Sequence, residues 1–387
     1  MGINVTLQAD HSASLPLEGT RVLDLTRVLA GPMCTMMLGD LGANVIKVER
    51  PETGDETRGW TARFENKPEA TAILGKIPKS PYFTSVNRNK LSVAADFNLP
   101  ADRELILTLA ADADVVVDNF LPRMLRSRGI DPDAIVRDSS RLIWCTITGF
   151  GAGNPRPGYD FVTQAECGWM AITGEPDGEP MKVGVALADV VAGKDAAIAI
   201  LAALAGRGAG RAINRRLVIS LADSARAALV NVAQTALMSG NNAKRWGNAH
   251  PNIVPYQLFH ASDQPIVIAV GSDAQWLACA TALGLADLYG DPSLLTNSGR
   301  LSNRERLVGR IEGAVGTNTA AYWLDRLGRA GVPTGVVKTV LQALKESAAS
   351  PTMGIPSSVG GSARREPPML DEHGAAIRQS GWRVFAA

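Results

Sequence analysis

Short apolar runs alternate with longer amphipathic stretches over residues 1–221 of the chain. Buried strands are predicted where Val, Ile and Leu cluster, at 21–26, 45–49, 91–95, 115–118, 142–146 and 217–221. Helices are predicted between them, at 33–41, at 101–111, from near Pro122 onwards, and at 190–204. Strands that alternate with helices pair in parallel through right-handed crossovers. The pattern therefore predicts a doubly wound, Rossmann-like α/β domain.

The pattern changes after residue 221. One helix is predicted at 222–239, followed by a polar joint at 240–247, a strand at 266–270, and helices at 274–283, 303–315 and 320–330. We interpret 222–341 as a smaller α+β domain with its connecting segments. Residues 342–387 are rich in Gly and Pro, and we expect this irregular segment to return to the large domain. The predicted division is thus 1–221 plus 342–387, and 222–341.

A long polar loop is predicted over residues 51–79, directly after the strand at 45–49. Ligands of open α/β sheets bind at the carboxyl ends of the strands, so loops in this position commonly carry function. Arg50, Arg58, Arg88 and Lys90 lie in and around the loops at this edge. They would either form a solvated face or meet phosphate groups, and the pattern alone leaves both readings open.

Composition narrows the classes of partner. The 387 residues carry a formal net charge of +1, so no electrostatic signal indicates nucleic acid or an anionic membrane surface. No apolar run approaches the roughly 20 residues of a membrane span. The four cysteines lack CxxC spacing, which is typical of buried thiols in a reducing compartment and predicts a cytoplasmic protein without a metal site. GxGxxG, GxxxxGK[ST], GxSxG and HExxH are all absent, so no tightly bound cofactor is expected.

One carboxylate, Asp189, stands in a stretch of small and apolar residues, Val183 to Gly193. Such surroundings solvate a charge poorly and raise the free energy of ionising it. The ordinary role for this Asp is to cap the helix predicted after it. A partly desolvated carboxylate held against an electrophile is also a competent nucleophile. This stretch by itself leaves both roles open.

Several long motifs follow one another along the chain. They are RVLDLTRVLAGP at 21–32, LGDLGANVIKVERP at 38–51, GDETR at 54–58, NRNK at 87–90, DNF at 118–120, TGFG at 148–151, RPGYD at 156–160, TG at 173–174, HPNIVPY at 250–256 and AGVP at 330–333. With these motifs in this order, the chain resembles the family III CoA-transferases over about residues 17–373. This group includes formyl-CoA transferase, carnitine CoA-transferase and α-methylacyl-CoA racemase.

The resemblance implies that Asp189 is the nucleophile of a CoA-transferase. In the family this Asp attacks an acyl-CoA donor to give a mixed anhydride, and the released thiolate then forms an aspartyl-CoA thioester. A small carboxylic acid acceptor displaces CoA through a second anhydride and leaves as the new acyl-CoA. The resemblance also implies a homodimer of two interlocked chains, with each active site between the large domain of one chain and the small domain of the other.

The family's CoA contacts fall on loops at the strand ends. Tyr159 and Asp160 are implied to lie beside the pantetheine and the thioester, and the Arg expected after the strand at 115–118 is Ser127 here. Arg126 or Arg128 is implied to replace it. The other implied contacts are Leu29, Ala30, Arg50, Ala95, Asp96, Asn98, Asn119, Phe120 and Leu121.

Two departures bear on the substrate and the reaction. Leu29 stands where formyl-CoA transferase has a Gln, which speaks against formate or oxalate. The racemase branch would have a His where this chain has Tyr159, and a Tyr with a pKa near 10 replaces a His acid–base group poorly. An acyl-CoA racemase or epimerase is the alternative to a CoA-transferase, and Tyr159 speaks against it. A third hypothesis is a CoA-binding protein without catalysis. The motifs do not identify the acyl donor or the acceptor.

Overall fold

The computed structural model describes residues 14–60, 80–121, 123–346, 354–355 and 357–386. The chain forms two compact units. The large unit consists of Met1–Trp169, Lys182–Asn241 and Ala349–Ala387, and the small unit consists of Met170–Met181 and Asn242–Ala348. Each unit has its own hydrophobic core.

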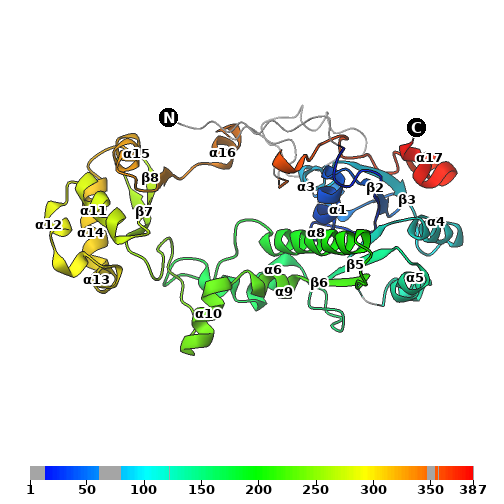
Figure 1. The fold of residues 1–387 in the computed structure, drawn as a ribbon, viewed down its shortest axis with the longest axis horizontal. Helices are drawn as coiled ribbons and strands as arrows, with labels where there is room; N and C mark the ends of the chain where they lie inside the picture. The colour runs from blue at the N-terminus through cyan, green and yellow to red at the C-terminus, as the bar shows by residue number, and fades with distance from the viewer. Residues whose placement is uncertain (1–13, 61–79, 122, 347–353, 356, 387) are drawn as a thin grey trace. The chain divides into compact units, whose positions relative to one another are not determined.

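A six-stranded parallel sheet forms the centre of the large unit, with the strand order β3-β2-β1-β4-β5-β6 (Figure 1). This is the order of the Rossmann fold, which confirms the predicted α/β class. The order reverses between β1 and β4, so the loops after these two strands diverge and leave room for a ligand. The strands are β1 (Arg21–Asp24), β2 (Asn44–Glu49), β3 (Lys90–Ala94), β4 (Val115–Asp118), β5 (Ile143–Thr148) and β6 (Arg216–Ser220).

Helices cover both faces of this sheet because neighbouring apolar residues on each strand point to opposite sides. Val22, Val45 and Val115 pack on one face with α1 (Ala30–Asp40) and α8 (Leu187–Gly208). On the other face Leu23, Ile46 and Val116 share a core with α4 (Pro100–Ala111), α5 (Pro132–Asp138) and α17 (Gly374–Ser380). The apolar runs that predict the strands therefore supply both cores.

Shorter elements complete the large unit. Around the carboxyl edge of the sheet lie η1 (Glu56–Gly59), α3 (Pro81–Ser85), η2 (Arg126–Arg128) and α6 (Asp160–Glu166). The others are α7 (Trp169–Ile172), which reaches into the small unit, and α9 (Leu221–Ala227), α10 (Val230–Ser239), η4 (Ser357–Val359) and η5 (Gly381–Phe385).

The small unit packs helices against an antiparallel sheet of three strands. Trp276, Phe259 and Ile311 are fully buried at its centre. Its strands are β7 (Tyr256–His260), β8 (Pro265–Ala269) and β9 (Thr334–Val336). Its helices are α11 (Asp273–Ala282), α12 (Ala286–Tyr289), η3 (Pro292–Leu294), α13 (Asn297–Ser302), α14 (Arg304–Val315), α15 (Ala320–Arg329) and α16 (Val340–Glu346).

Several local predictions differ from the structure. No helix continues from the region of Pro122, which itself lies outside the described residues; turns and η2 follow β4, and α5 begins only at Pro132. The helix predicted at 222–239 is two helices, because the chain turns at Leu229 and Val230 takes a positive φ of 42°. Most of the loop predicted at 51–79, residues 61–79, lies outside the described residues.

The boundary of the small unit falls at Asn242, later than the predicted residue 222. Helix α9 stays with the large unit because its Leu221, Ala222 and Ala225 are buried against neighbours there. The C-terminal segment is also less irregular than predicted. Its α17 places Ile377 in the core under the sheet, and Trp382 donates from its indole N–H to the carbonyl of Leu109 at 3.0 Å. No helix among the described ranges is long and apolar enough to cross a membrane.

Candidate active site

Asp189 lies in the first turn of α8, at the third helical position after the N-cap Ala186. The structure shows no side-chain cap on this helix, which begins at Leu187 and not after Asp189. The capping role is therefore wrong, and the Asp189 side chain is not needed to begin the helix. An anion in the first turn still gains from the partial positive charge of the helix N-terminus.

Close packing between two helices sets the position of Asp189. A Cβ added at Gly193 would lie 2.6 Å from the carbonyl oxygen of Ala30, so only glycine lets α8 approach the start of α1 this closely. Gly193 follows Asp189 by one helical turn on the same face. This contact places Asp189 beside the loop that joins β1 to α1.

The Asp189 carboxylate is buried yet lacks hydrogen-bond donors. Its residue is 9% exposed, and within the described part of the chain no group donates a hydrogen bond to its carboxylate. Burial, together with the nearby charge of Asp160, raises the pKa of Asp189 to about 7. The charge on Asp189 is thus poorly stabilised when the site is empty.

Asp160 is equally buried but has two donors. It accepts a hydrogen bond from the Ala188 backbone at 2.8 Å and another from Gln164 Nε2 at 2.7 Å. The side-chain oxygen of Gln164, Oε1, in turn accepts a hydrogen bond from the Val183 backbone N–H at 2.8 Å. Asp160 and Gln164 therefore fasten the segment that leads into Asp189.

A cavity of about 210 Å³ opens onto Asp189. The structure brings seven of the sequence-predicted residues together in its lining: Leu29, Ala30, Asn119, Phe120, Leu121, Tyr159 and Asp189. Gly149 and Gly158 pass so closely that a Cβ on either would meet the other's backbone, which draws the Tyr159 segment up to the strand β5. Asp160 is not in this lining.

A second cavity of about 200 Å³ lies next to the first and shares Arg27, Phe120 and Met124 with it. Arg50, Ala95, Asp96 and Asn98 line this second cavity. Arg128 lines it too. Arg126 lines neither of the two and pairs with Asp131 and Asp133. Of the two arginines beside Ser127, Arg128 thus lines this cavity and Arg126 does not.

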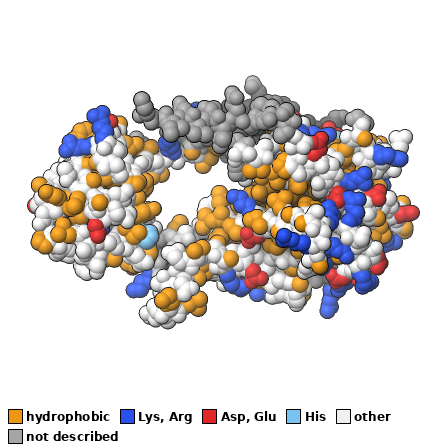
Figure 2. Space-filling view, viewed as in Figure 1, with side chains coloured by type: hydrophobic (Ala, Val, Ile, Leu, Met, Phe, Trp, Pro, Cys, Tyr) orange, Lys and Arg blue, Asp and Glu red, His pale blue; other side chains and the backbone are white. Residues whose placement is uncertain are grey.

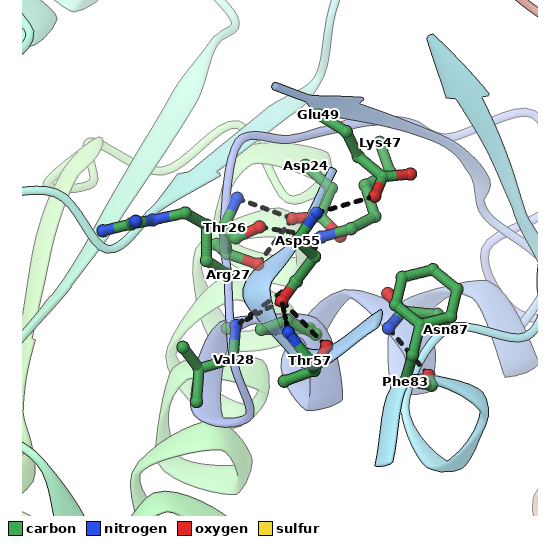
Figure 3. A network of polar contacts seen from close by, with 12 residues as sticks. Asp24, Thr26, Arg27, Val28, Lys47, Glu49, Asp55, Thr57, Phe83 and Asn87 are labelled. Carbon is green, nitrogen blue, oxygen red and sulfur yellow. Dashed lines mark hydrogen bonds and ion pairs between the residues drawn. The ribbon is translucent and has the colours of Figure 1, made fainter. Parts of the chain in front are cut away.

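A buried network of charges supports the loop between β1 and α1 (Figure 3). Lys47 forms an ion pair with Asp55 at 3.2 Å and donates to the Thr26 carbonyl at 2.7 Å. The Val28 backbone, at a φ of 70°, donates to the Asp55 carboxylate at 3.3 Å. Beneath them Lys90 pairs with Asp24 at 2.9 Å. Burial opposes the charge on Asp55, but Lys47 and Thr57 keep the pKa of its carboxyl below the usual value.

Sequence reasoning did not single out Arg27, Lys47, Asp55 or Gln164. Arg27 is held through its backbone, because Asn119 accepts from its N–H at 3.0 Å and donates to its carbonyl at 2.7 Å. The signal for Arg27 was its place in the loop after the first strand, the same signal that marks Leu29.

The described residues contain no group of three or more His, Cys, Asp or Glu able to hold a metal ion.

The sequence is similar to those of known CoA-transferases. The model of CoA-transferase family III matches residues 17–355. The chain is 38% identical to succinyl-CoA:glutarate CoA-transferase of Mus musculus, over 95% of this chain and 86% of that protein. It is 34% identical to acetyl-CoA:oxalate CoA-transferase of Acetobacter aceti, over 94% and 95% of the two.

A solved structure shows the same fold. The CAIB/BAIF family protein from Brucella suis superposes with a TM-score of 0.81 at 38% identity, covering 95% of this chain and 99% of that one. Rv3272 from Mycobacterium tuberculosis, in its orthorhombic form, gives a TM-score of 0.76 at 28% identity, over 94% of this chain and 99% of that one. The chain belongs to CoA-transferase family III.

Proposed function

We propose that this enzyme moves CoA from an acyl-CoA thioester to a free carboxylic acid, with Asp189 as the nucleophile. The observation that carries this proposal is the Asp189 carboxylate itself, which is buried, has no hydrogen-bond donor among the described residues and opens onto a cavity. A pKa of about 7 leaves much of this carboxylate ionised near neutral pH while its poor solvation keeps it reactive.

Each step exchanges one bond at a carbonyl carbon. Asp189 attacks the donor thioester, which gives a mixed anhydride and CoA thiolate. The thiolate attacks the aspartyl carbonyl, so the donor acid leaves and an aspartyl-CoA thioester forms. The acceptor carboxylate displaces the thiolate to give a second anhydride, and the thiolate then takes the acceptor acyl group and frees Asp189. Backbone N–H groups near the first turn of α8 would stabilise the oxyanion at each step.

Succinyl-CoA is the donor that the relatives favour. The curated relatives include succinyl-CoA:glutarate and succinyl-CoA:mesaconate CoA-transferases at 36–38% identity. We infer a short dicarboxylic acyl group for this chain, with succinyl-CoA and glutarate as the first pair to assay.

The racemase alternative lacks a supporting observation. Tyr159 is 60% exposed, and Asp160 is held by Ala188 and Gln164 outside the lining of the Asp189 cavity. Two opposed acid–base groups at an α-carbon do not arise from this pair. A CoA-binding protein without catalysis would have no use for a buried Asp189 carboxylate that lacks hydrogen-bond donors among the described residues, so this observation does not favour the third hypothesis.

We also propose that the enzyme is an interlocked homodimer. Helix α10 has no buried residue, and Val230, Leu237 and Met238 on it are 69%, 79% and 80% exposed. Figure 2 shows hydrophobic side chains on the surface where Figure 1 places this helix. An apolar helix of this kind is typical of a subunit interface. A second copy of the chain is the expected partner. Sedimentation at nanomolar concentration should show a dimer, and a stable, active monomer would contradict this.

Asp189→Asn tests the nucleophile directly. The amide cannot form an anhydride or a thioester, so transfer from succinyl-CoA to glutarate should fall by several orders of magnitude while CoA still binds. Asp223→Asn is a matched control, because Asp223 holds the same third position of helix α9 but is exposed. It should keep full activity.

A trapping experiment locates the covalent intermediate. Wild-type enzyme incubated with succinyl-CoA and then with hydroxylamine or borohydride should carry one modification, which peptide mass analysis should place on Asp189. A modification on Asp160 would move the nucleophile to the first residue of α6. Full activity of Asp189→Asn would end the proposed mechanism.

A further inference from the structure

The two cavities at the carboxyl edge of the sheet meet at Arg27, which lines both of them together with Phe120 and Met124. An extended ligand that occupies both must pass this side chain. Under the proposed function, on which this inference rests, that ligand is CoA, and its thiol end must reach the cavity that contains Asp189. The nucleotide end then falls in the cavity lined by Arg50, Asp96 and Asn98.

The Arg27 side chain is only partly engaged by the protein. One terminal nitrogen, Nη1, pairs with Glu56, and the guanidinium lies over the ring of Phe120 at 5.5 Å. Within the described ranges Nη2 has no partner, and Nε is buried without one. Figure 3 shows the side chain extending away from the Lys47–Asp55 network. The protein therefore orients Arg27 but leaves donors unused.

The charges at this junction do not balance. Arg27 and Arg50 both contact the single carboxylate of Glu56, Arg50 at 3.4 Å. The cations beneath them are already matched, since Lys47 pairs with Asp55 and Arg58 with Glu49. One positive charge at the meeting point of the two cavities is thus left for a ligand anion.

We propose that Arg27 binds the diphosphate of CoA through Nη2, the terminal guanidinium nitrogen that the described residues leave without a partner. The diphosphate is the anionic group that lies between the adenosine and the pantetheine arm, and guanidinium groups bind phosphate oxygens through paired, charge-assisted hydrogen bonds. Glu56 and Phe120 hold the guanidinium in place, and Asn119 fixes the backbone of the same residue. In this arrangement Arg27 lies where the nucleotide of CoA ends and the pantetheine arm towards Asp189 begins.

Equilibrium binding of three ligands to Arg27→Gln tests this assignment. CoA and 3′-dephospho-CoA both contain the diphosphate, so both should bind about tenfold more weakly or worse, by the same factor. Pantetheine has no phosphate, and its binding, measured by competition with labelled CoA, should not change. Arg137→Gln is the control, because Arg137 is exposed and, in the described part of the chain, pairs only with its neighbour Asp138.

Three results would overturn the proposal. An equal loss of pantetheine binding would show that Arg27 acts on the loop and not on the diphosphate. A loss confined to CoA would assign Arg27 to the 3′-phosphate, and unchanged affinity for all three ligands would exclude a contact. Glu56→Gln gives a second test that keeps Arg27 in place: removing the competing carboxylate should tighten CoA and dephospho-CoA but not pantetheine, and weaker binding of both would contradict the charge argument.

These measurements do not depend on catalysis. If CoA transfer failed but CoA bound as predicted to the Arg27 variants, the proposed reaction would be wrong and the diphosphate site would stand. If transfer through Asp189 were established and Arg27→Gln bound CoA normally, only the diphosphate assignment would fail.

Discussion

Asp24 and Asp189 stand on one side of the same sheet and are almost equally buried, at 0% and 9% exposure. Asp24 accepts hydrogen bonds from Thr26, Thr35 and Lys90. Burial alone would raise the pKa of Asp24, but Lys90 and Lys47 together with these hydroxyls hold it well below its usual range. Asp189 has no such partners among the residues that the structure describes, and burial together with the charge of Asp160 raises its pKa to about 7.

The difference shows that burial raises the free energy of ionising a carboxyl group, and that its hydrogen-bond and ion-pair partners decide whether this increase is offset. Asp24 is stable as an anion and serves the structure. Asp189 is left poorly stabilised, and under the proposed function this is the carboxylate that attacks the thioester. Four predictions test how far this contrast holds, beginning with the largest expected effect.

Asp24→Asn should destabilise the enzyme strongly. The amide keeps one acceptor for Thr26 but leaves Lys90 buried without the carboxylate that it pairs with, and breaking such a buried pair costs about 3–5 kcal/mol. Denaturant unfolding at pH 8 would measure this. A loss of less than about 1 kcal/mol, within the range of an ordinary surface substitution, would mean that the network does not need the charge of Asp24.

Asp189→Asn should raise the free energy of unfolding at pH 8, whereas Asp24→Asn lowers it. Because the pKa of Asp189 is higher in the folded enzyme than in the unfolded chain, the unfolded chain ionises first as the pH rises, and the folded state loses stability between about pH 4 and pH 7. The rise from 3.8 to about 7 corresponds to a penalty of up to about 4 kcal/mol above pH 7.

The neutral amide removes this penalty. Asp189→Asn should therefore unfold at higher denaturant than wild type at pH 8, and the two should converge at pH 4 and below. An advantage that stays constant from pH 4 to pH 8 would show that it does not arise from ionisation. A variant less stable than wild type at pH 8 would show that Asp189 is stabilised by its surroundings after all.

Gly193→Ala tests whether packing places Asp189 at the cavity. The new methyl would collide with the Ala30 carbonyl, so α8 must shift from α1, with an expected loss of about 1–3 kcal/mol and a lower kcat. Gly208→Ala is the control within the same helix, because a Cβ there meets nothing within 4 Å. It should be neutral or slightly stabilising. Equal behaviour of both variants in unfolding and turnover would refute the packing argument.

Arg128→Ala and Arg126→Ala extend the contrast to cations. Arg126 has two carboxylate partners, whereas the Arg128 side chain donates to the Met124 carbonyl at 3.1 Å. Loss of Arg128 should weaken CoA binding about tenfold, since it lines the second cavity, and loss of Arg126 should change it little. Calorimetric titration with CoA would compare them, and the reverse order would return the contact to Arg126.

The parallel sheet could be predicted because its signal is local. Neighbouring residues such as Val22 and Leu23 are both apolar and feed opposite cores, which only a strand covered on two faces requires. The break between α9 and α10 has no local signal, since Leu229 and Val230 continue the apolar pattern and no Gly or Pro interrupts it.

The candidate site could be predicted in outline for the same reason. Asp189 stood out through its own apolar neighbours, and the strand-end loops followed from topology. The choice between Arg126 and Arg128 depends on Asp131 and Asp133 taking one of the two, a competition that motif position does not reveal. The donors that hold Asp160 come from Gln164 and from Ala188, and the pairing with Ala188 exists only once α6 and α8 have packed.

The return of the C-terminal segment has a consequence for how the enzyme is made. Ile377 and Trp382 belong to the same core as Leu23 and Ile46, which a ribosome releases hundreds of codons earlier. The small unit's residues 242–348 are synthesised in between and have a core of their own. During synthesis the small unit can therefore complete its core first, while the part of this sheet face that Ile377 and Trp382 cover stays open until the last residues emerge. Nascent chains of this enzyme should consequently need protection of that face from aggregation, most of all when translation stalls before residue 374.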